Sequence, residues 1–153
     1  MNADTPHFTR PSPVEHLFNK LFGFLVGLGV GLRHNYVLQV RGRKTGRIYS
    51  TPVNILEMDG KRFLVAPRGQ TQWVRNAKAS GRVSLKKGFK SEQFRLRAIP
   101  DEEKAEILKK YLDSFSTTVH RYFPIPAGSP RAAFQPLAPR YPIFELIDDS
   151  SSR

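Results

Sequence analysis

Cysteine is absent from the 153-residue chain. That absence excludes disulfide bonds, thiolate zinc sites and cysteine nucleophiles. The four histidines do not stand at the spacing of metal ligands, so no metal site is predicted. The sequence also lacks the glycine-rich motifs of Rossmann and P-loop nucleotide sites and the G-x-S-x-G motif of serine hydrolases. No residue is therefore singled out as catalytic.

Acidic residues are scarce in the middle of the chain. Between Arg33 and Arg97 there are 16 Lys and Arg residues but only 3 Asp and Glu residues, a balance of +13, whereas the whole chain carries +12. This scarcity argues against a pair of catalytic carboxylates there. The positive excess attracts an anionic partner, namely nucleic acid, an acidic membrane surface or a phosphorylated cofactor. The alternative is a basic surface that only aids solubility.

A hydrophobic run long enough to cross a membrane is also missing. Residues 21–32 are uncharged and extend a helix predicted over residues 13–32. Twelve helical residues span about 18 Å, against a hydrocarbon core of about 30 Å. Gly23, Gly27 and Gly31 form a stripe of small residues, which suits packing on the protein's own sheet or partial insertion into a membrane surface. We expect a cytoplasmic protein. The alternative is a protein bound peripherally at the inner face of the cell membrane.

The length of the chain suits one domain. We expect a loose segment at residues 1–12, one domain over residues 13–149 and a frayed tail at residues 150–153. Alternating apolar and polar residues, with turn signals at Asp59-Gly60 and Lys87-Gly88, predict strands joined mainly by hairpins. The predicted fold is mainly β (α+β): a six-stranded antiparallel barrel with flanking helices. The predicted strands cover residues 36–41, 47–57, 62–66, 83–86, 93–99 and 143–147.

Two further helices are indicated by apolar spacing and end signals. A short helix is predicted over residues 71–80 and ends at Gly81, and a long helix over residues 101–115 opens with acidic residues. The following residues, 116–142, contain six of the twelve prolines and several aromatic residues. Because a flexible linker would be rich in Ser and Gly and poor in aromatics, we predict an ordered covering loop.

The strongest local feature is a basic turn at residues 42–46, Gly-Arg-Lys-Thr-Gly. Glycines at both ends let the backbone turn sharply. Arg43 and Lys44 supply positive charge, and Thr45 supplies a hydroxyl beside backbone N–H groups. These are features of a phosphate-binding loop, and they also fit a hairpin turn that happens to be basic.

A second feature is the strand end at residues 65–69, which leads into the short helix that carries Trp73 and Asn76. Free N–H groups at the start of a helix can meet electronegative atoms of a ring, and Trp73 can form an aromatic wall. A lone tryptophan more often packs in a core, and that alternative stays open here.

Taken in order, three segments resemble one known family. They are LQVRGRKTGRIYSTPV (residues 38–53), FLVAPRG (63–69) and WVRNAKASGRVSL (73–85). They resemble the deazaflavin-dependent nitroreductase and quinone reductase family, whose members have a split β-barrel related to flavin-binding barrels. The resemblance covers about residues 36–112. It implies an oxidoreductase that transfers a hydride from reduced 8-hydroxy-5-deazaflavin (coenzyme F-420) to an apolar acceptor such as a quinone, enone, nitro compound or lipid.

The resemblance also implies a cofactor site. Its fifteen residues are Arg43, Lys44, Thr45, Tyr49, Ser50, Thr51, Pro52, Val53, Asn54, Val65, Ala66, Pro67, Arg68, Trp73 and Asn76. The first three would hold the phosphate, the next six would line the ribityl chain and ring edge, and the following four would meet the ring with backbone groups. The last two would border the far side of the ring. Because the cofactor carries the hydride, the protein needs no nucleophile of its own.

Some members of this family place tyrosines after the last long helix against the substrate. By this resemblance, Tyr122 and Phe123 are expected to contact the acceptor, although the proline-rich segment breaks a position-by-position match. Three alternatives remain: the same barrel holding FMN or haem, a lipid carrier without redox activity, and a nucleic-acid-binding module. Nucleic acid is the least favoured, because stacking modules interleave exposed aromatics with their basic residues. The sequence does not indicate the oligomeric state.

Overall fold

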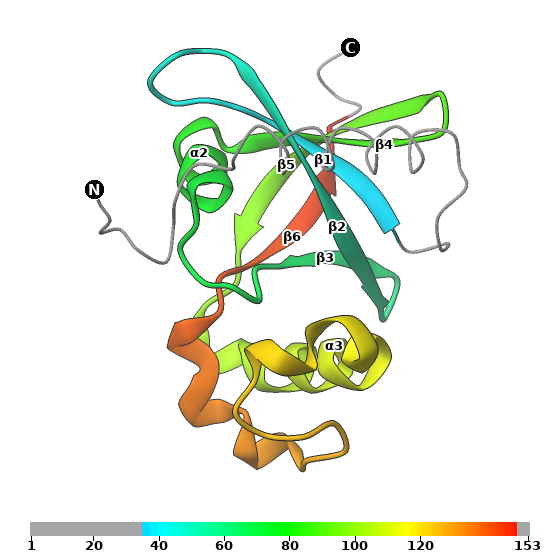
Figure 1. The fold of residues 1–153 in the computed structure, drawn as a ribbon, viewed down its shortest axis with the longest axis vertical. Helices are drawn as coiled ribbons and strands as arrows, with labels where there is room; N and C mark the ends of the chain where they lie inside the picture. Colours follow the sequence, from blue (N-terminus) through cyan, green and yellow to red (C-terminus); the bar gives the residue numbers. More distant parts are fainter. Residues whose placement is uncertain (1–34, 150–153) are drawn as a thin grey trace.

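The computed structural model describes residues 35–149 (Figure 1). The helix predicted over residues 13–32, the segment 1–12 and the tail 150–153 lie outside the described residues. Within them, six antiparallel strands close into a barrel in the order β1-β2-β3-β6-β5-β4, with β4 paired to β1. The predicted antiparallel barrel with flanking helices is confirmed. The strands are β1 (Asn35–Arg41), β2 (Ile48–Met58), β3 (Lys61–Val65), β4 (Arg82–Lys87), β5 (Lys90–Ala98) and β6 (Ile143–Asp148).

The barrel has apolar residues on both faces of β2 and β3. Ile55 and Leu64 are fully buried and join the cluster that fills the barrel. Their neighbours Leu56 and Phe63 point the other way and join a second cluster against the long helix. Successive side chains alternate between the faces of a strand, so both clusters come from the same two strands. This explains why two adjacent residues of each strand, Ile55-Leu56 and Phe63-Leu64, are both apolar.

Within the described part of the chain, two α-helices pack against the barrel. The helix α2 (Gln72–Ser80) ends at Gly81, whose φ of 73° is the left-handed conformation that glycine adopts readily. A 3-10 turn, η1 (Asp101–Glu103), leads into α3 (Lys104–Val119). α3 ends four residues after the expected position 115, although its backbone departs from helical geometry at Phe115. Among residues 35–149, no helix combines the length and the apolar character that a bilayer crossing requires.

The segment after α3 is held by aromatic packing. It contains three more 3-10 turns: η2 (His120–Tyr122), η3 (Arg131–Ala133) and η4 (Gln135–Arg140). Phe123 stacks on Tyr141 with ring centroids 4.5 Å apart, and both rings are buried in the second cluster. Figure 1 shows this segment wrapped around α3 at the end of the molecule away from the barrel. The prolines make the backbone of this segment irregular, and the packing of its aromatic residues holds it in one conformation.

Asp113 fastens this segment to α3, and we predict that Asp113→Asn lowers stability in a pH-dependent way. The carboxylate accepts hydrogen bonds from the Gly128 N–H (2.8 Å) and from Lys109 Nζ (3.0 Å). The Gly128 bond is the main reason that the pKa of Asp113 is lowered. Because the side chain is exposed, the expected cost at neutral pH is only about 1 kcal/mol.

The sign of the pH dependence follows from the lowered pKa of Asp113. Its stabilisation is present above the usual pKa of an aspartate and is lost as the pH falls through the lowered value. Urea denaturation of both proteins at pH 7 and at about pH 3 measures the difference. We expect the gap to narrow at the acidic pH, whereas an equal gap at both would contradict this role.

Candidate functional site

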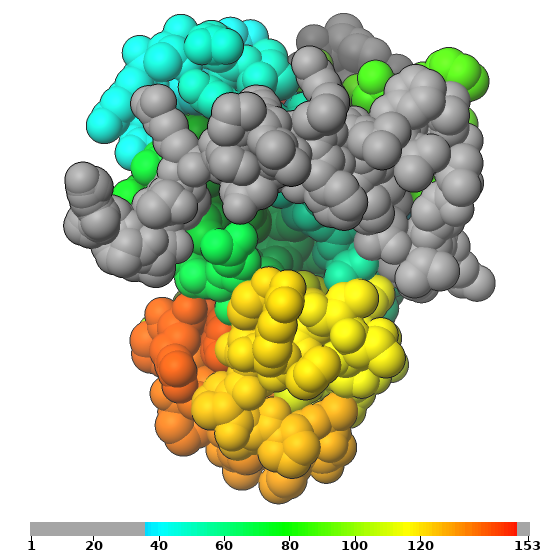
Figure 2. Space-filling view, in the orientation of Figure 1, coloured from blue at the N-terminus to red at the C-terminus, as the bar shows by residue number. Residues whose placement is uncertain are grey.

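A cavity of about 890 Å³ opens between the β1–β2 hairpin, α2 and the end of α3. Figure 2 shows a hollow where the barrel meets the yellow end of α3. All fifteen residues that the family resemblance assigned to the cofactor line this cavity, and Tyr122 lines it as well. Among the described residues, seven others also line the cavity: Gly42 of the predicted basic turn, and Thr71, Gln72, Tyr111, Thr118, Val119 and Arg121, which the sequence did not indicate.

The basic turn at residues 42–46 is a tight loop between β1 and β2. The Gly42 N–H donates to the Arg47 carbonyl (2.6 Å), and the Gly46 N–H donates to the Gly42 carbonyl (2.9 Å). Gly46 has a φ of 76°, which favours glycine. At Gly42 the reason is space, because an added Cβ would lie 2.6 Å from Cε2 of Tyr49. We call residues 42–46 the basic loop.

Gly42→Ala is therefore expected to push the Tyr49 ring out of its place in the cavity wall. Because Tyr49 is 45% exposed and its ring can shift, the cost should be about 1 kcal/mol, the lower end for overpacking. The same substitution in a Tyr49→Ala background should cost less, because the closest contact is gone and only the longer ones to Thr45 Oγ1 (3.0 Å) and the Arg47 carbonyl (3.3 Å) remain. Thermal denaturation of the two single variants and the double variant measures this coupling. Equal costs in both backgrounds would show that Gly42 is needed for another reason.

α2 holds the basic loop from the other side of the cavity. The Oδ1 atom of Asn76 accepts two hydrogen bonds from Arg43, one from the backbone N–H (3.1 Å) and one from Nη1 (2.7 Å). The same Nη1 also donates to Oε1 of Gln72 (2.9 Å). Among the described residues, these side-chain bonds use only Nη1 of the guanidinium and leave Nε and Nη2 as donors. Arg43 is thus oriented before any ligand arrives.

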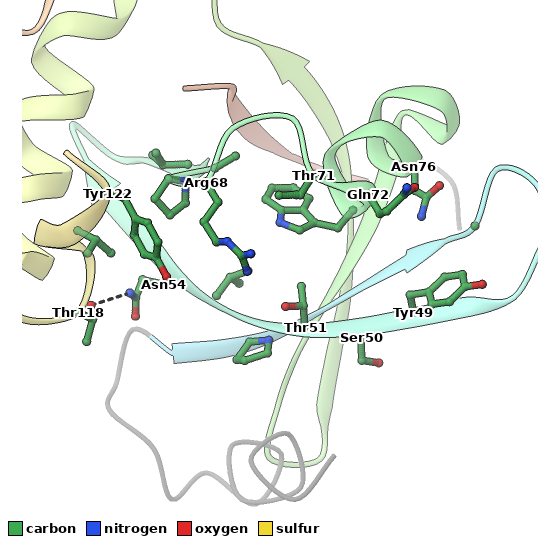
Figure 3. Close-up of a pocket in the computed structure, with 18 of the residues that line it drawn as sticks. Tyr49, Ser50, Thr51, Asn54, Arg68, Thr71, Gln72, Asn76, Thr118 and Tyr122 are labelled. Carbon is green, nitrogen blue, oxygen red and sulfur yellow. Dashed lines mark hydrogen bonds between the residues drawn. The ribbon is translucent and has the colours of Figure 1, made fainter. Parts of the chain in front are cut away.

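The first turn of α2 supplies further polar groups to the cavity. Thr71 caps the helix in an extended conformation without a side-chain capping bond. Its Oγ1 is buried and has no hydrogen-bond partner among the described residues. The ring of Trp73 is partly buried, 6.5 Å from Phe144 between ring centroids, and one side of the residue lines the cavity. In Figure 3 the Gln72 side chain lies beside that of Asn76, and Thr51 lies on β2 across the space below Thr71.

The opposite end of the cavity is formed by the end of α3. The Asn54 side-chain amide donates to Oγ1 of Thr118 (3.4 Å), which links β2 to α3. Burial raises the pKa of Tyr111, an effect that a hydrogen bond with Asn54 partly offsets, so this phenol stays neutral over the physiological range. Tyr122 lies beside Asn54 in Figure 3, and its backbone carbonyl accepts a hydrogen bond from the Tyr141 hydroxyl (2.6 Å).

Phe123 does not line the cavity, unlike the adjacent Tyr122. It is absent from the cavity lining, and its ring is 8% exposed and stacked on Tyr141. The expectation that Phe123 contacts the acceptor therefore does not match its place in the structure. The physical reason is that Phe123 adopts an extended backbone directly after η2, which turns its side chain into the aromatic cluster beneath α3.

The residues that sequence reasoning missed fall into two groups. Thr71 and Gln72 directly precede Trp73, and the free N–H groups of the predicted helix start were a signal for them. Thr118 and Arg121 carried no such signal, because they reach the cavity only through the packing of α3 on the barrel. Tyr111 lies within the predicted long helix, and nothing local in the sequence marks it as a cavity residue.

Comparison with known proteins identifies the family. A sequence profile described as F420H(2)-dependent quinone reductase matches residues 19–122. The chain belongs to the F420H(2)-dependent quinone reductase family. The resemblance seen in the sequence is thereby confirmed. As a member of this reductase family, the chain is an oxidoreductase whose cofactor is the deazaflavin coenzyme F-420. The family name also implies a small apolar acceptor.

Solved structures support the fold of this family member. An F420-H2 dependent reductase is 21% identical, with a TM-score of 0.51, and the match covers 74% of this chain and 94% of that one. A protein described as a domain-swapped dimer is 21% identical, with a TM-score of 0.55 and coverages of 88% and 99%. A protein of unknown function from Agrobacterium tumefaciens is 18% identical, with a TM-score of 0.58. That match covers 97% of this chain but only 60% of the other. No curated protein is significantly similar to the chain.

Proposed function

We propose that the cavity binds coenzyme F-420 with the anionic chain of the coenzyme at the basic loop and its ring between β2 and the start of α2. The main support for this proposal is that residues from three separate segments, chosen by motif order alone, line one cavity of about 890 Å³. That volume is within the range of cofactor and ligand sites, about 300 to 1,000 Å³.

The polar groups of the cavity fit such a ligand. At one end, Arg43 has donors left over after its bonds to α2, and Lys44 and Thr45 lie on the same loop. A guanidinium fork and a lysine are well suited to a phosphate and to carboxylates. In the wall, the buried hydroxyl of Thr71 has no partner among the described residues and can pair with a polar atom of a ring.

The chemistry is then divided between cofactor and protein. When bound, the reduced deazaflavin supplies the hydride. Trp73 and the backbone of residues 65–68 limit where the ring can lie and exclude water from one face. We propose that Tyr122 contacts the acceptor at the α3 end, where its phenol can hydrogen-bond an oxygen that gains a proton as the hydride arrives.

The acceptor class we propose is a quinone, an enone, a nitro compound or a lipid. The α3 end of the cavity combines apolar Val119 with the neutral phenol of Tyr111 and with Tyr122, which suits a flat apolar molecule with one or two oxygens. Contact with a membrane through residues 13–32, and a location in the cytoplasm, remain predictions from the sequence.

Calorimetric titration tests the proposed function. The full-length protein is titrated with oxidised coenzyme F-420 and, separately, with FMN. We expect saturable one-site binding of the deazaflavin and much weaker binding of FMN. Incubation of the protein with reduced deazaflavin and a quinone should then give stoichiometric oxidation of the coenzyme. Tighter binding of FMN, or bound deazaflavin that no acceptor reoxidises, would contradict the proposal.

A further inference from the structure

The hairpin between β4 and β5 carries an unusual tip. Lys87 and Lys90 pair across it, so the loop consists of Gly88 and Phe89 alone. Gly88 has a φ of 63°, and Phe89 is not in the positive region. This is the pattern of a tight hairpin turn with glycine in its first position. The turn places the Phe89 ring outside the body of the barrel, where it is 94% exposed.

Three lysines flank this aromatic residue in the sequence. Lys86 and Lys90 are exposed on the two strands of the hairpin, and Lys87 Nζ lies 4.9 Å from the centroid of the Tyr36 ring on β1. A single exposed apolar residue is common on protein surfaces. An exposed aromatic residue at a hairpin tip, with exposed lysines on both strands, is the combination that suits the headgroup region of a bilayer, where aromatic rings insert and lysines meet phosphates.

The charge of the described residues is distributed in the same direction. The barrel segments, residues 35–100 and 143–149, contain 15 Lys and Arg residues against 6 Asp and Glu residues. Residues 101–142, which form α3 and the segment after it, contain 6 against 5. In Figure 1 the β4–β5 tip lies at the barrel end of the molecule, and α3 lies at the opposite end. An anionic surface would therefore attract the end that carries Phe89.

We propose that the β4–β5 hairpin docks the protein on an anionic lipid bilayer, with Phe89 inserted between headgroups and Lys86 and Lys90 against lipid phosphates. A nucleic acid is less suitable, because base stacking uses several aromatic rings along a groove. The second aromatic residue of this hairpin, Phe94, is 1% exposed inside the barrel. The docking does not depend on the cofactor. If the proposed function holds, it brings the cavity to acceptors dissolved in the membrane.

Vesicle flotation of the full-length protein tests the docking. We expect binding to phosphatidylcholine vesicles that contain phosphatidylglycerol and little binding to phosphatidylcholine alone. Phe89→Ser should weaken binding about tenfold, and the pair Lys86→Gln and Lys90→Gln by about fivefold for each lysine. The matched control, Lys110→Gln with Arg140→Gln, removes the same charge from exposed positions at the α3 end and should have little effect.

A spectroscopic variant separates this hairpin from any other membrane contact. The chain has one tryptophan, Trp73, so Phe89→Trp adds a single reporter at the tip. Brominated lipids should quench the added emission while that of the unmodified protein changes little. Three results would overturn the proposal: no extra quenching, unchanged vesicle affinity of Phe89→Ser, or tighter binding to a DNA duplex than to anionic vesicles.

Discussion

Reversing the charges of Arg43 and Lys44 together, as Arg43→Glu with Lys44→Glu, is expected to weaken binding of coenzyme F-420 by about 100-fold or more. Both residues line the cavity at the basic loop, and the guanidinium of Arg43 is already oriented by Asn76 and Gln72. Two charge-assisted hydrogen bonds to an anionic group would be lost, and repulsion would replace them. Calorimetric titration of the variant with the oxidised coenzyme measures the change.

A matched control separates the loop from the general charge of the protein. Lys110→Glu with Arg140→Glu changes the net charge equally, at exposed positions on α3 and η4. This control should bind the coenzyme nearly as well as the unmodified protein at moderate salt, because long-range attraction is screened there. Thermal denaturation shows whether the basic-loop variant is folded. A folded variant with unchanged affinity would rule out the basic loop as the phosphate site.

Asn76→Leu is expected to have the second large effect, on stability and on cofactor affinity together. Asn76 is 6% exposed, and its Oδ1 accepts from both the backbone N–H and Nη1 of Arg43. Leucine keeps the size of the side chain but leaves these donors without their acceptor. The expected cost is about 2 kcal/mol of unfolding free energy. Because the basic loop loses its anchor, affinity for the coenzyme should also fall about tenfold.

Asn76→Asp distinguishes the hydrogen bonds from packing. The carboxylate keeps an acceptor at the same place and pairs with the charged guanidinium of Arg43, so most of the lost stability should return. Urea denaturation of the two variants measures this recovery. If the leucine variant loses stability but binds the coenzyme as tightly as the unmodified protein, Asn76 is a structural residue and does not position the loop for ligand.

The sequence predicted those strands and turns whose residue pattern depends only on near neighbours in the chain. Alternation predicted β1, and the Asp59-Gly60 turn predicted the hairpin of β2 and β3. The end of α3 was not accessible in this way. Thr118 and Val119 continue the helix past Phe115 because the helix end packs on the barrel and on Asn54, a contact between residues 64 positions apart. Local sequence carries little information about such a contact.

In the site, too, local motifs predicted some of the residues, and long-range packing determines the others. The motif order brought the basic loop, the strand end and Trp73 into one hypothesis, and the structure places them around one cavity. Tyr122 and Phe123 could not be separated, since they are adjacent and both aromatic. Their orientations depend on Tyr141, which stacks on Phe123 and donates a hydrogen bond to the backbone of Tyr122. That partner is 19 residues away from Tyr122 and becomes a neighbour only in the folded protein.

A crystal structure of the protein with oxidised coenzyme F-420 tests the central claim most directly. We predict that a phosphate oxygen lies within hydrogen-bond distance of Arg43 or Lys44, and that the deazaflavin ring lies beside Trp73 with a polar atom near the Thr71 hydroxyl. A coenzyme bound elsewhere, with the basic loop directed into solvent and side chains filling the space beside Trp73, would contradict the account.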